Sequence, residues 1–502
     1  MMLRQGKQQG WLSYPPEAFQ QWASLNGIDF IHCRPGHVIG RGNALIADQQ
    51  LGDSESESSL LELLSIPRDL VLGLESVQSI ARRDAEFKEV LDATGDFGQT
   101  ARGAILTLLL FIAANSHPHN AGRLGISGSL QPYVKSLPLE HLPTFWSTSE
   151  LRLLIGTTLA PAIASKLRSL QREWTSLEQS IQNSMFYRHC GSQLSFDDWL
   201  IVDAMYRSRA LDFPGIGHCM VPCLDLANHV PHEETTCVYD LTPDGNVVLL
   251  LRPGKQVDQS EEVTISYGDE KGACEMLFSY GFLDSKMDTA EALFLNLAIP
   301  PSDPQKVAKM HFADVAPGVK IIDAKDGEVD WKSDFIWLLC VSDEDGLEFK
   351  LASLTDGSME VNTFFRDELL TEGPVQLYRL LARSPLWPVY RLRAVAILQE
   401  RIYEQMELLS NSQDDVEDVQ HDEDADISIT VFKQILKLRL LEFELLDHAY
   451  QHLEKEKLEL AENEVVQKYL AQVNSGPLDH GEAAVDDDDS GVKANEDVED
   501  FS

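Results

Sequence analysis

The chain of 502 residues has little positive charge: 41 lysines and arginines stand against 81 aspartates and glutamates, which gives a formal charge of −40. A surplus of negative charge of this size repels a phosphate backbone and disfavours direct binding of nucleic acid. It favours a basic protein or peptide as the partner. Because 43% of the residues are hydrophobic, the chain can bury a sizeable core, and its length allows about two to four domains.

The chain also lacks a CxxC pair, and its seven cysteines are odd in number and scattered, which predicts a reducing compartment. Cys219 and Cys223 stand beside His218, but the sequence offers no further ligands at matching spacing, so we expect buried thiols and no metal. The N-terminus has no apolar signal core, and the longest apolar stretch, 104–114, is too short to span a bilayer. Together these features predict a soluble intracellular protein without a membrane partner. Because no Lys/Arg-rich import cluster is visible, we expect the cytoplasm by default, and residence in the nucleus stays open.

Hydrophobic periodicity indicates an α+β protein. Short apolar runs broken by glycine and polar clusters predict strands before about residue 74 and again between about 211 and 285. Between them, 77–211 carries apolar residues at intervals of three and four, which indicates helices. We therefore expect a mostly β unit that begins near residue 30 and is interrupted by a helical insert.

The remainder of the chain predicts a mainly α-helical domain over 286–475. It contains two long amphipathic stretches, at about 387–411 and 427–459, and a short strand-like patch, DFIWLLCVSD, at 334–343. The acidic segment 412–426 and the acidic tail 476–502 are expected to be solvated and disordered.

The segment MVPCLDLANH, 220–229, gathers polar groups at the end of an apolar run. Asp225, Asn228 and His229 stand at one point of the chain rather than along a solvent face. Taken alone, an Asn-His pair in this position is also typical of a turn or of a hydrogen-bonded core pair. Other motifs have to decide between these interpretations.

Two further motifs place aromatic residues and glycines where elements end. In VTISYGDEKGACEMLFSYGF, a β-branched strand ends at Tyr267, and a helical stretch ends at Tyr280 thirteen residues later. Gly40 and Gly42 lie in GRGN between two apolar stretches. That loop lacks the Lys-Ser/Thr of a phosphate loop and the third glycine of a dinucleotide fingerprint, so alone it indicates a turn between strands.

An inward-facing arginine follows a capped helix. Ser195 with Asp198 forms an N-terminal capping pattern. On a helical wheel Arg209 falls in the apolar sector of this helix, whereas Arg207 falls well outside it. A buried guanidinium needs an anion, which is either a structural carboxylate or a ligand.

In this order and spacing, the motifs resemble a SET-domain methyltransferase, and within that superfamily the group named after the Rubisco large-subunit lysine methyltransferase (LSMT). MVPCLDLANH is similar to the family's asparagine-histidine segment, VTISYG to its catalytic-tyrosine strand, LFSYGF to the aromatic that follows and GRGNALIA to its opening glycine turn. The resemblance implies an α+β fold: a β-rich SET domain over 20–285 with a helical insert at about 77–211, then a helical substrate-binding domain over 286–475.

The resemblance also implies a role for each matching residue, with S-adenosylmethionine as the cofactor and no metal. Tyr267 is expected to be catalytic. The residues expected to hold the cofactor are Gly40, Gly42, Arg209, Asp225, Asn228, His229 and Tyr280. Those expected to line the substrate pocket are Tyr239, Tyr280 and Phe282. Arg41 and Asn43 differ from the apolar residues often seen in the glycine turn, so only a backbone role is carried over there.

These residue types suit methyl transfer to an amine, which is an in-line displacement that requires alignment at about 3–3.5 Å and a neutral nucleophile. An aromatic-walled channel disfavours the lysine cation and tolerates a sulfonium. We therefore expect a protein-lysine N-methyltransferase acting on a non-histone, basic protein such as a ribosomal or translation component. Two alternatives stay open: a histidine acceptor in the same fold, and a SET-derived binding scaffold without turnover.

Overall fold

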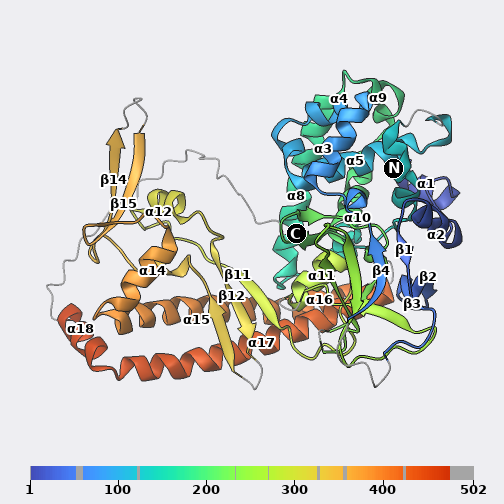
Figure 1. Cartoon of the computed structure of the whole chain (residues 1–502). Helices are drawn as coiled ribbons and strands as arrows, with labels where there is room; N and C mark the ends of the chain where they lie inside the picture. The colour runs from blue at the N-terminus through green and yellow to red at the C-terminus, as the bar shows by residue number, and fades with distance from the viewer. Residues whose placement is uncertain are drawn as a thin grey trace.

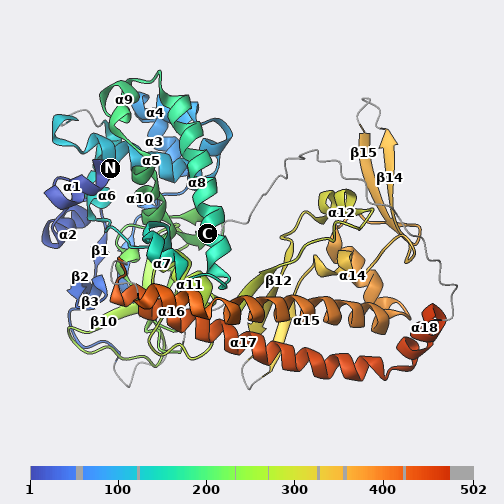
Figure 2. The ribbon, with the colours of Figure 1, turned by 180° about the vertical axis from the view of Figure 1, so that it is seen from behind.

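The computed structural model describes residues 2–52, 60–120, 125–231, 233–268, 271–324, 328–353, 359–421 and 426–474. They form two lobes, which Figures 1 and 2 show from opposite sides. The first lobe, built up to about residue 283, contains small sheets beneath a group of helices. The second lobe contains small sheets beside long helices. Two of these, α15 (Trp387–Asn411) and α17 (Ile429–Ala461), run side by side from the second lobe towards the first.

Two four-stranded sheets form the β part of the first lobe. One has the order β1 (Asp29–Phe30), β4 (Leu61–Ile66), β9 (Val247–Leu251) and β8 (Cys237–Leu241). The other has the order β2 (Cys33–Val38), β3 (Gly42–Ala47), β10 (Glu262–Ile265) and β7 (Asn228–His229). Neighbouring strands are antiparallel except β10 and β7, which are parallel. Each sheet therefore joins strands from before and after the helical insert.

The pattern of apolar residues explains which strands are central. The sequence VVLLL of β9 lies between β4 and β8 and is buried at every position but one. A continuous apolar run is what a strand covered on both faces requires. Gly40 lies in the turn from β2 to β3 and Gly42 begins β3, and both are left-handed with φ of +82° and +83°. Glycine adopts this backbone without the steric cost that a Cβ brings.

The helices between these strands surround one apolar helix, α5 (Ala101–Asn115), which is buried from Gly103 to its end. Four of the helices packed against it are α3 (Leu74–Arg83), α4 (Ala85–Ala93), α6 (Gln131–Ser136) and α10 (Phe196–Arg207). The longest helix of this region is α8 (Leu159–Ile181). A helix that is apolar on all sides belongs in a protein core or in a membrane, and α5 lies in the core. Within the ranges that the structure describes, no helix has both the length and the apolar character needed to cross a membrane.

The second lobe has more β structure than the sequence predicts. Its two three-stranded sheets are β11 (Ala292–Asn296), β12 (Gly318–Asp323) and β13 (Val329–Lys332), then β14 (Leu347–Ser353), β15 (Met359–Phe365) and β16 (Glu368–Leu369). The strand predicted at 334–343 is wrong, because that segment contains the helix α13 (Ile336–Leu339). A short run of adjacent apolar residues has no period that separates strand from helix.

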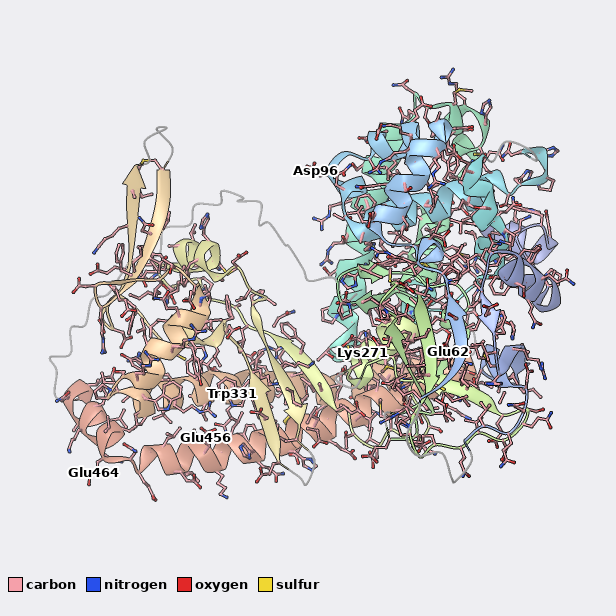
Figure 3. All side chains as sticks on the ribbon, in the orientation of Figure 1. Glu62, Asp96, Lys271, Trp331, Glu456 and Glu464 are labelled. Atoms are coloured by element: carbon pink, nitrogen blue, oxygen red, sulfur yellow. The ribbon has the colours of Figure 1, made fainter. Side chains whose placement is uncertain are left out.

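The two long helices predicted for this lobe are confirmed as α15 and α17. They are accompanied by α12 (Lys306–Ala313), α14 (Pro374–Arg383) and α18 (Glu464–Asn474). Arg391 of α15 forms an ion pair with Glu456 of α17 at 2.5 Å and lies 4.5 Å from the ring centroid of Trp331 on β13. Trp331 and Glu456 are labelled in Figure 3. This contact fastens β13 to the helix pair.

The disorder predicted for 412–426 is wrong over the helix α16 (Gln413–His421). Val416 and Val419 are only 1% and 2% exposed and belong to the apolar cluster that the two lobes share. Two valines at helical spacing therefore anchor a helix whose other residues are mostly acidic. Residues 422–425 of this segment and the whole tail 476–502 lie outside the described residues.

Buried polar groups join α17 to the helical insert of the first lobe. Glu442 is 0% exposed and accepts hydrogen bonds from the backbone N–H of Thr158, at 3.0 Å, and from its hydroxyl. Arg439 donates to the carbonyl oxygens of Ile155 and Leu409. Burial raises the pKa of Glu442 to about 7. The two lobes also share apolar core, since α11 (Ala273–Tyr280) packs in one cluster with α15 and α17.

The cysteines are all free thiols. Cys219 and Cys223 are buried, and burial raises the pKa of Cys219 to about 12. Such thiols stay protonated near neutral pH, whereas a metal ligand is a thiolate. Among the residues that the structure describes, no group of three His, Cys, Asp or Glu side chains could hold a metal ion.

Candidate active site

The segments that end at His229 and at Tyr267 lie side by side. In the parallel pair of β7 and β10, Asn228 is opposite Thr264 and His229 is opposite Ile265. Beyond the pair, the backbone N–H of Tyr267 donates to Nδ1 of His229 at 3.1 Å. Two motifs separated by 38 residues in the chain are thereby fixed in one register, which agrees with the shared site that the resemblance implies.

A tight turn directs the chain into β7. Cys223 has a left-handed φ of +74°, which is uncommon for a residue with a side chain, and a short 3-10 turn, Leu224–Leu226, follows it. The turn places the carbonyl oxygen of Ala227 where it accepts a hydrogen bond from the Tyr267 hydroxyl at 3.2 Å. Backbone in sparsely populated regions is frequent at functional sites, and no sequence signal predicts this one.

The ring of Tyr267 lies in a group of aromatic rings. The ring centroid of Tyr267 lies 4.5 Å from that of Tyr280 and 5.2 Å from that of His229. Phe282 is 6.4 Å from His229 and 6.5 Å from Tyr280. The ring centroid of Tyr239 lies 5.1 Å from that of Phe213, and Tyr239 contributes to the raised pKa of Tyr280. The predicted catalytic and substrate residues therefore gather in one aromatic cluster.

Tyr267 and Tyr280 stay neutral at physiological pH. Burial raises the pKa of Tyr267 above its ordinary value, although Arg209 opposes the rise. Burial and the nearby Glu275 also raise the pKa of Tyr280. Lys271 forms an ion pair with Glu275 at 2.8 Å, and its amine lies 5.5 Å from the ring centroid of Tyr280. Figure 3 labels Lys271 in the first lobe. A neutral tyrosine can orient other groups by hydrogen bonding but is not a strong base.

Arg209 is bound by carboxylates of the protein. It donates to Oε1 of Glu140 at 2.9 Å and to the carbonyl oxygen of Asp225 at 2.6 Å, and the Asp225 carboxylate lies 3.8 Å away. Tyr133 donates to the same carboxylate at 2.9 Å. Although burial opposes the charge on Arg209, Asp225 and Glu140 raise its pKa. Of the two anions considered from the sequence, the structural carboxylate is present. The contact with a cofactor carboxylate stays a prediction.

The helix α10 has the capping box predicted at Ser195 and Asp198. The placement of Arg207 outside the inward sector is wrong, because Arg207 is 4% exposed. It lies 3.4 Å from Asp203 and donates to the carbonyl oxygen of Phe278. Helix α10 is packed on all sides by other helices, so its wheel has no solvent sector to receive an arginine.

The hairpin of β2 and β3, which contains Gly40 and Gly42 and is here called the glycine hairpin, lies against the Asn-His segment. Asn228 donates through Nδ2 to the carbonyl oxygen of Asn43 at 3.3 Å and to Glu262 at 2.5 Å. Arg41 forms an ion pair with Glu262 at 2.8 Å and donates to the carbonyl oxygen of His229. Only a backbone role is expected at this position from the sequence, but the Arg41 side chain also binds Glu262 and the His229 backbone. A Cβ placed on Gly40 or Gly42 would find no atom within 4 Å, so there is open space above both.

The structure therefore brings the predicted residues into one region with two parts. The aromatic part contains His229, Tyr239, Tyr267, Tyr280 and Phe282, and the polar part contains Gly40, Gly42, Arg209, Asp225 and Asn228. Sequence reasoning missed Tyr133, Glu140 and Glu262. Charged or polar side chains that meet a site only through tertiary contacts carry no local signal of that role.

No family model matches the chain. Among curated proteins, it is 25% identical to SET domain-containing protein 8 of Schizosaccharomyces pombe, over 67% of this chain and 75% of that protein. It is 29% identical to the [fructose-bisphosphate aldolase]-lysine N-methyltransferase of Arabidopsis thaliana over 35% of this chain, and 28% identical to the ribulose-1,5 bisphosphate carboxylase/oxygenase large subunit N-methyltransferase of Pisum sativum over 34%. These two alignments span 38% and 36% of the relatives' own lengths.

Solved structures of the same fold cover nearly the whole chain. The SET domain of LSMT bound to lysine and AdoHcy has a TM-score of 0.61 and 17% identity, over 92% of this chain and 96% of that one. Rubisco LSMT bound to AdoMet has a TM-score of 0.59 and 18% identity, again over 92% and 96%. The predicted α+β fold and the resemblance to the LSMT group are thereby confirmed. The likeness in fold also extends over both lobes.

Proposed function

We propose that this chain, a SET-domain protein with the fold of the LSMT group, is an S-adenosylmethionine-dependent protein-lysine N-methyltransferase that acts on a basic, non-histone protein. One observation carries the proposal: the parallel pairing of β7 and β10 sets the Tyr267 hydroxyl on the Ala227 carbonyl oxygen, inside an aromatic cluster. The names of the relatives support it, since two of them are protein N-methyltransferases and one of these two is named a lysine N-methyltransferase.

The polar part of the region suits the cofactor. S-adenosylmethionine supplies an electrophilic methyl group, and its amino-acid end carries a carboxylate. Arg209 is a buried cation whose Nε has no hydrogen-bond partner among the described residues, so it retains a donor for such a carboxylate. The open space above Gly40 and Gly42 leaves room for a bound molecule against the backbone. Asn228 and His229 adjoin the same hairpin and would hold the adenosyl part.

The aromatic part suits a neutral amine. An incoming lysine loses its hydration among Tyr267, Tyr280 and Phe282, which lowers the pKa of its amine and favours the nucleophilic form. The Tyr267 hydroxyl and the Ala227 carbonyl oxygen fix polar atoms at one point of this apolar wall, so they can orient the lone pair. Because Tyr267 stays protonated, its part is orientation, and the amine proton leaves to water before transfer.

The charge of the chain supports a basic substrate. With a formal charge of −40, the protein attracts basic proteins over distances comparable to the Debye length, about 8–10 Å at physiological salt. This attraction raises the association rate and falls with added salt. A ribosomal or translation protein has the required composition.

Two assays test the proposal. Calorimetric titration of the full chain with S-adenosylmethionine should give saturable binding that Asn228→Ala weakens. Transfer of a tritiated methyl group to proteins of a cell extract should then label a product with the wild type and not with Tyr267→Phe. Hydrolysis of the product should release methylated lysine. Methylated histidine would replace the lysine assignment, and cofactor binding without any labelled product would show a scaffold instead.

A further inference from the structure

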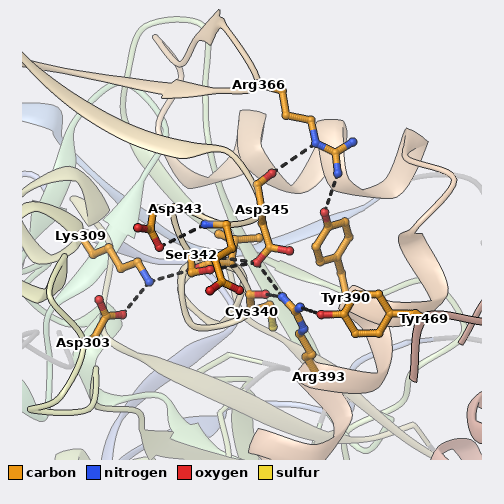
Figure 4. Close-up of polar contacts among 12 residues, drawn as sticks. Asp303, Lys309, Cys340, Ser342, Asp343, Asp345, Arg366, Tyr390, Arg393 and Tyr469 are labelled. Carbon is orange, nitrogen blue, oxygen red and sulfur yellow. Dashed lines mark hydrogen bonds and ion pairs between the residues drawn. The ribbon is translucent and has the colours of Figure 1, made fainter. Parts of the chain in front are cut away.

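The second lobe contains a cavity of about 370 Å³ that is remote from the aromatic cluster. It lies where the start of α12, the turn between α13 and β14, and the helix α15 meet (Figure 4). Pro300, Pro304, Leu339 and Val341 supply apolar wall, and charged side chains occupy the rest. Cavities of roughly 300–1,000 Å³ with a few placed polar groups are typical of ligand sites.

The cations of the cavity already have partners. Lys309 is 1% exposed, and its amine donates to Asp303 and to the Val341 carbonyl oxygen, both at 2.7 Å. Arg393 donates to Asp345 and to the Cys340 carbonyl oxygen, both at 2.7 Å, and to the Tyr469 hydroxyl at 2.6 Å. Figure 4 shows both networks. These contacts brace the walls and leave the cations poorly placed to attract an anion.

Acceptor atoms remain. The side-chain oxygen of Gln305 is buried and has no hydrogen-bond partner among the described residues, while its amide nitrogen is held by the Leu347 carbonyl oxygen at 2.9 Å. Asp343 is exposed at the rim, and no cation is paired with its carboxylate in the described structure. The lining holds three carboxylates, Asp303, Asp343 and Asp345, and two cations, so its formal charge is −3 + 2 = −1. A buried acceptor without a donor is costly and marks a place for one.

We propose that this cavity is a docking site for a basic side chain, an arginine or a lysine, of the protein substrate. The aliphatic stem of such a residue packs on the two prolines and Leu339, and its charged end donates to Gln305 and Asp343. The choice of a substrate segment as occupant rests on the function proposed above, and on the surplus of acid over base both in the cavity and in the whole chain.

A docking site in the second lobe makes recognition bivalent. The acceptor lysine would enter the first lobe while a second basic residue is held in the other, and α15 and α17 keep the two lobes in a fixed relation. The second contact then forms at a high effective concentration, provided that the substrate spans both places. A protein substrate gains from this arrangement, and a short peptide around the target lysine does not.

The test measures binding without cofactor or turnover. The probe is a fluorescein-labelled peptide in which four arginines alternate with glycines, and its anisotropy is followed on titration with the full chain. Asp343→Lys removes the rim acceptor, and Gln305→Met removes the buried one at similar volume. Asp330→Lys is the matched control, because Asp330 is also exposed, also accepts the N–H of the residue that follows it, makes the same change in net charge, and lies outside the cavity.

We expect Asp343→Lys to weaken peptide binding at least tenfold, Gln305→Met three- to tenfold, and Asp330→Lys less than twofold. Equal weakening by the two lysine variants would show that the peptide senses only the overall charge and would overturn the proposal. So would undetectable binding to the wild type, or unchanged binding by Gln305→Met. If Asp343→Lys does not fold, Gln305→Met alone decides. If the wild type binds the peptide but transfers no methyl group, the result would contradict the proposed function and still support the docking site.

Discussion

The aromatic cluster of the first lobe and the charged cavity of the second treat charge in opposite ways. Around Tyr267 the hydroxyls of Tyr267 and Tyr280 are neutral, and a nearby cation, Arg209, is bound by Glu140 and Asp225. Around Lys309 the charged groups line the wall of an open cavity. The first arrangement favours a neutral amine, and the second favours a cation. A lysine would thus be recognised differently in each lobe, as a nucleophile in one and as a charge in the other.

The largest effect on stability is expected from Arg209→Met. Asp225 is only 2% exposed in its side chain, so loss of the guanidinium leaves a carboxylate that water cannot reach. Removing one partner of a buried pair typically costs about 3–5 kcal/mol of the free energy of unfolding. Urea denaturation measures this change. Arg209→Lys, which keeps the charge but not the forked geometry, should lose less, and a loss below about 1 kcal/mol for Arg209→Met would show that Asp225 is already neutral.

A pH effect of intermediate size is expected at Glu442, which joins the two lobes. Its pKa is raised from 4.5 to about 7 by burial, so the folded state holds a proton that the unfolded state releases. The free energy of unfolding should therefore fall as the pH rises from about 4.5 to about 7, by up to ~3 kcal/mol in total. Glu442→Gln mimics the protonated form. In this variant, the free energy of unfolding measured by denaturation should depend much less on pH across this range. If the pH dependence of the free energy of unfolding is unchanged in the variant, other titrating groups cause it.

A smaller loss is expected from the same kind of substitution in the second lobe, Lys309→Met. Its partner Asp303 is 18% exposed, so water can replace part of the lost ion pair. We expect ~2 kcal/mol, below the loss in Arg209→Met because the stranded carboxylate is less buried. Titration with S-adenosylmethionine should be unchanged, since the affected wall lies in the other lobe. An equal loss in both variants would mean that the exposure of the remaining carboxylate does not set the cost.

The comparison also shows which features the sequence could predict. His229 ends β7 and Tyr267 follows β10, and the pairing of these two strands agrees with the shared site that the resemblance to the LSMT group implies. Glu140 and Tyr133 meet Arg209 only through the packing of the insert, and neither stands in a motif. In the second lobe, short strands such as β12 alternate too briefly to be separated from helix by periodicity.

The acidic helix α16 shows the converse error. Its composition is typical of a disordered segment, yet Val416 and Val419 are buried. Composition averages over residues, whereas two apolar side chains on one face suffice to dock a helix when a ready surface faces them. The cavity of the second lobe also could not be predicted from composition. Gln305, Asp343 and Arg393 come from three separate parts of the chain, and only the fold reveals that they share a wall.

The smallest effect on stability is expected at the glycine hairpin, where the predicted cofactor contact can be separated from backbone strain. Gly42→Ala places a Cβ in open space but at a φ of +83°, so it should lower the free energy of unfolding by only about 1–2 kcal/mol. Gly254→Ala is the matched control, with a φ of +74° and the same open surroundings in a turn away from Asn228. The two variants should lose similar stability in thermal unfolding, but only Gly42→Ala should weaken S-adenosylmethionine binding, by tenfold or more. Equal affinity of the two variants for S-adenosylmethionine would show that the glycine hairpin is not part of the cofactor site. The assignment of Tyr267 and its aromatic neighbours would be unaffected.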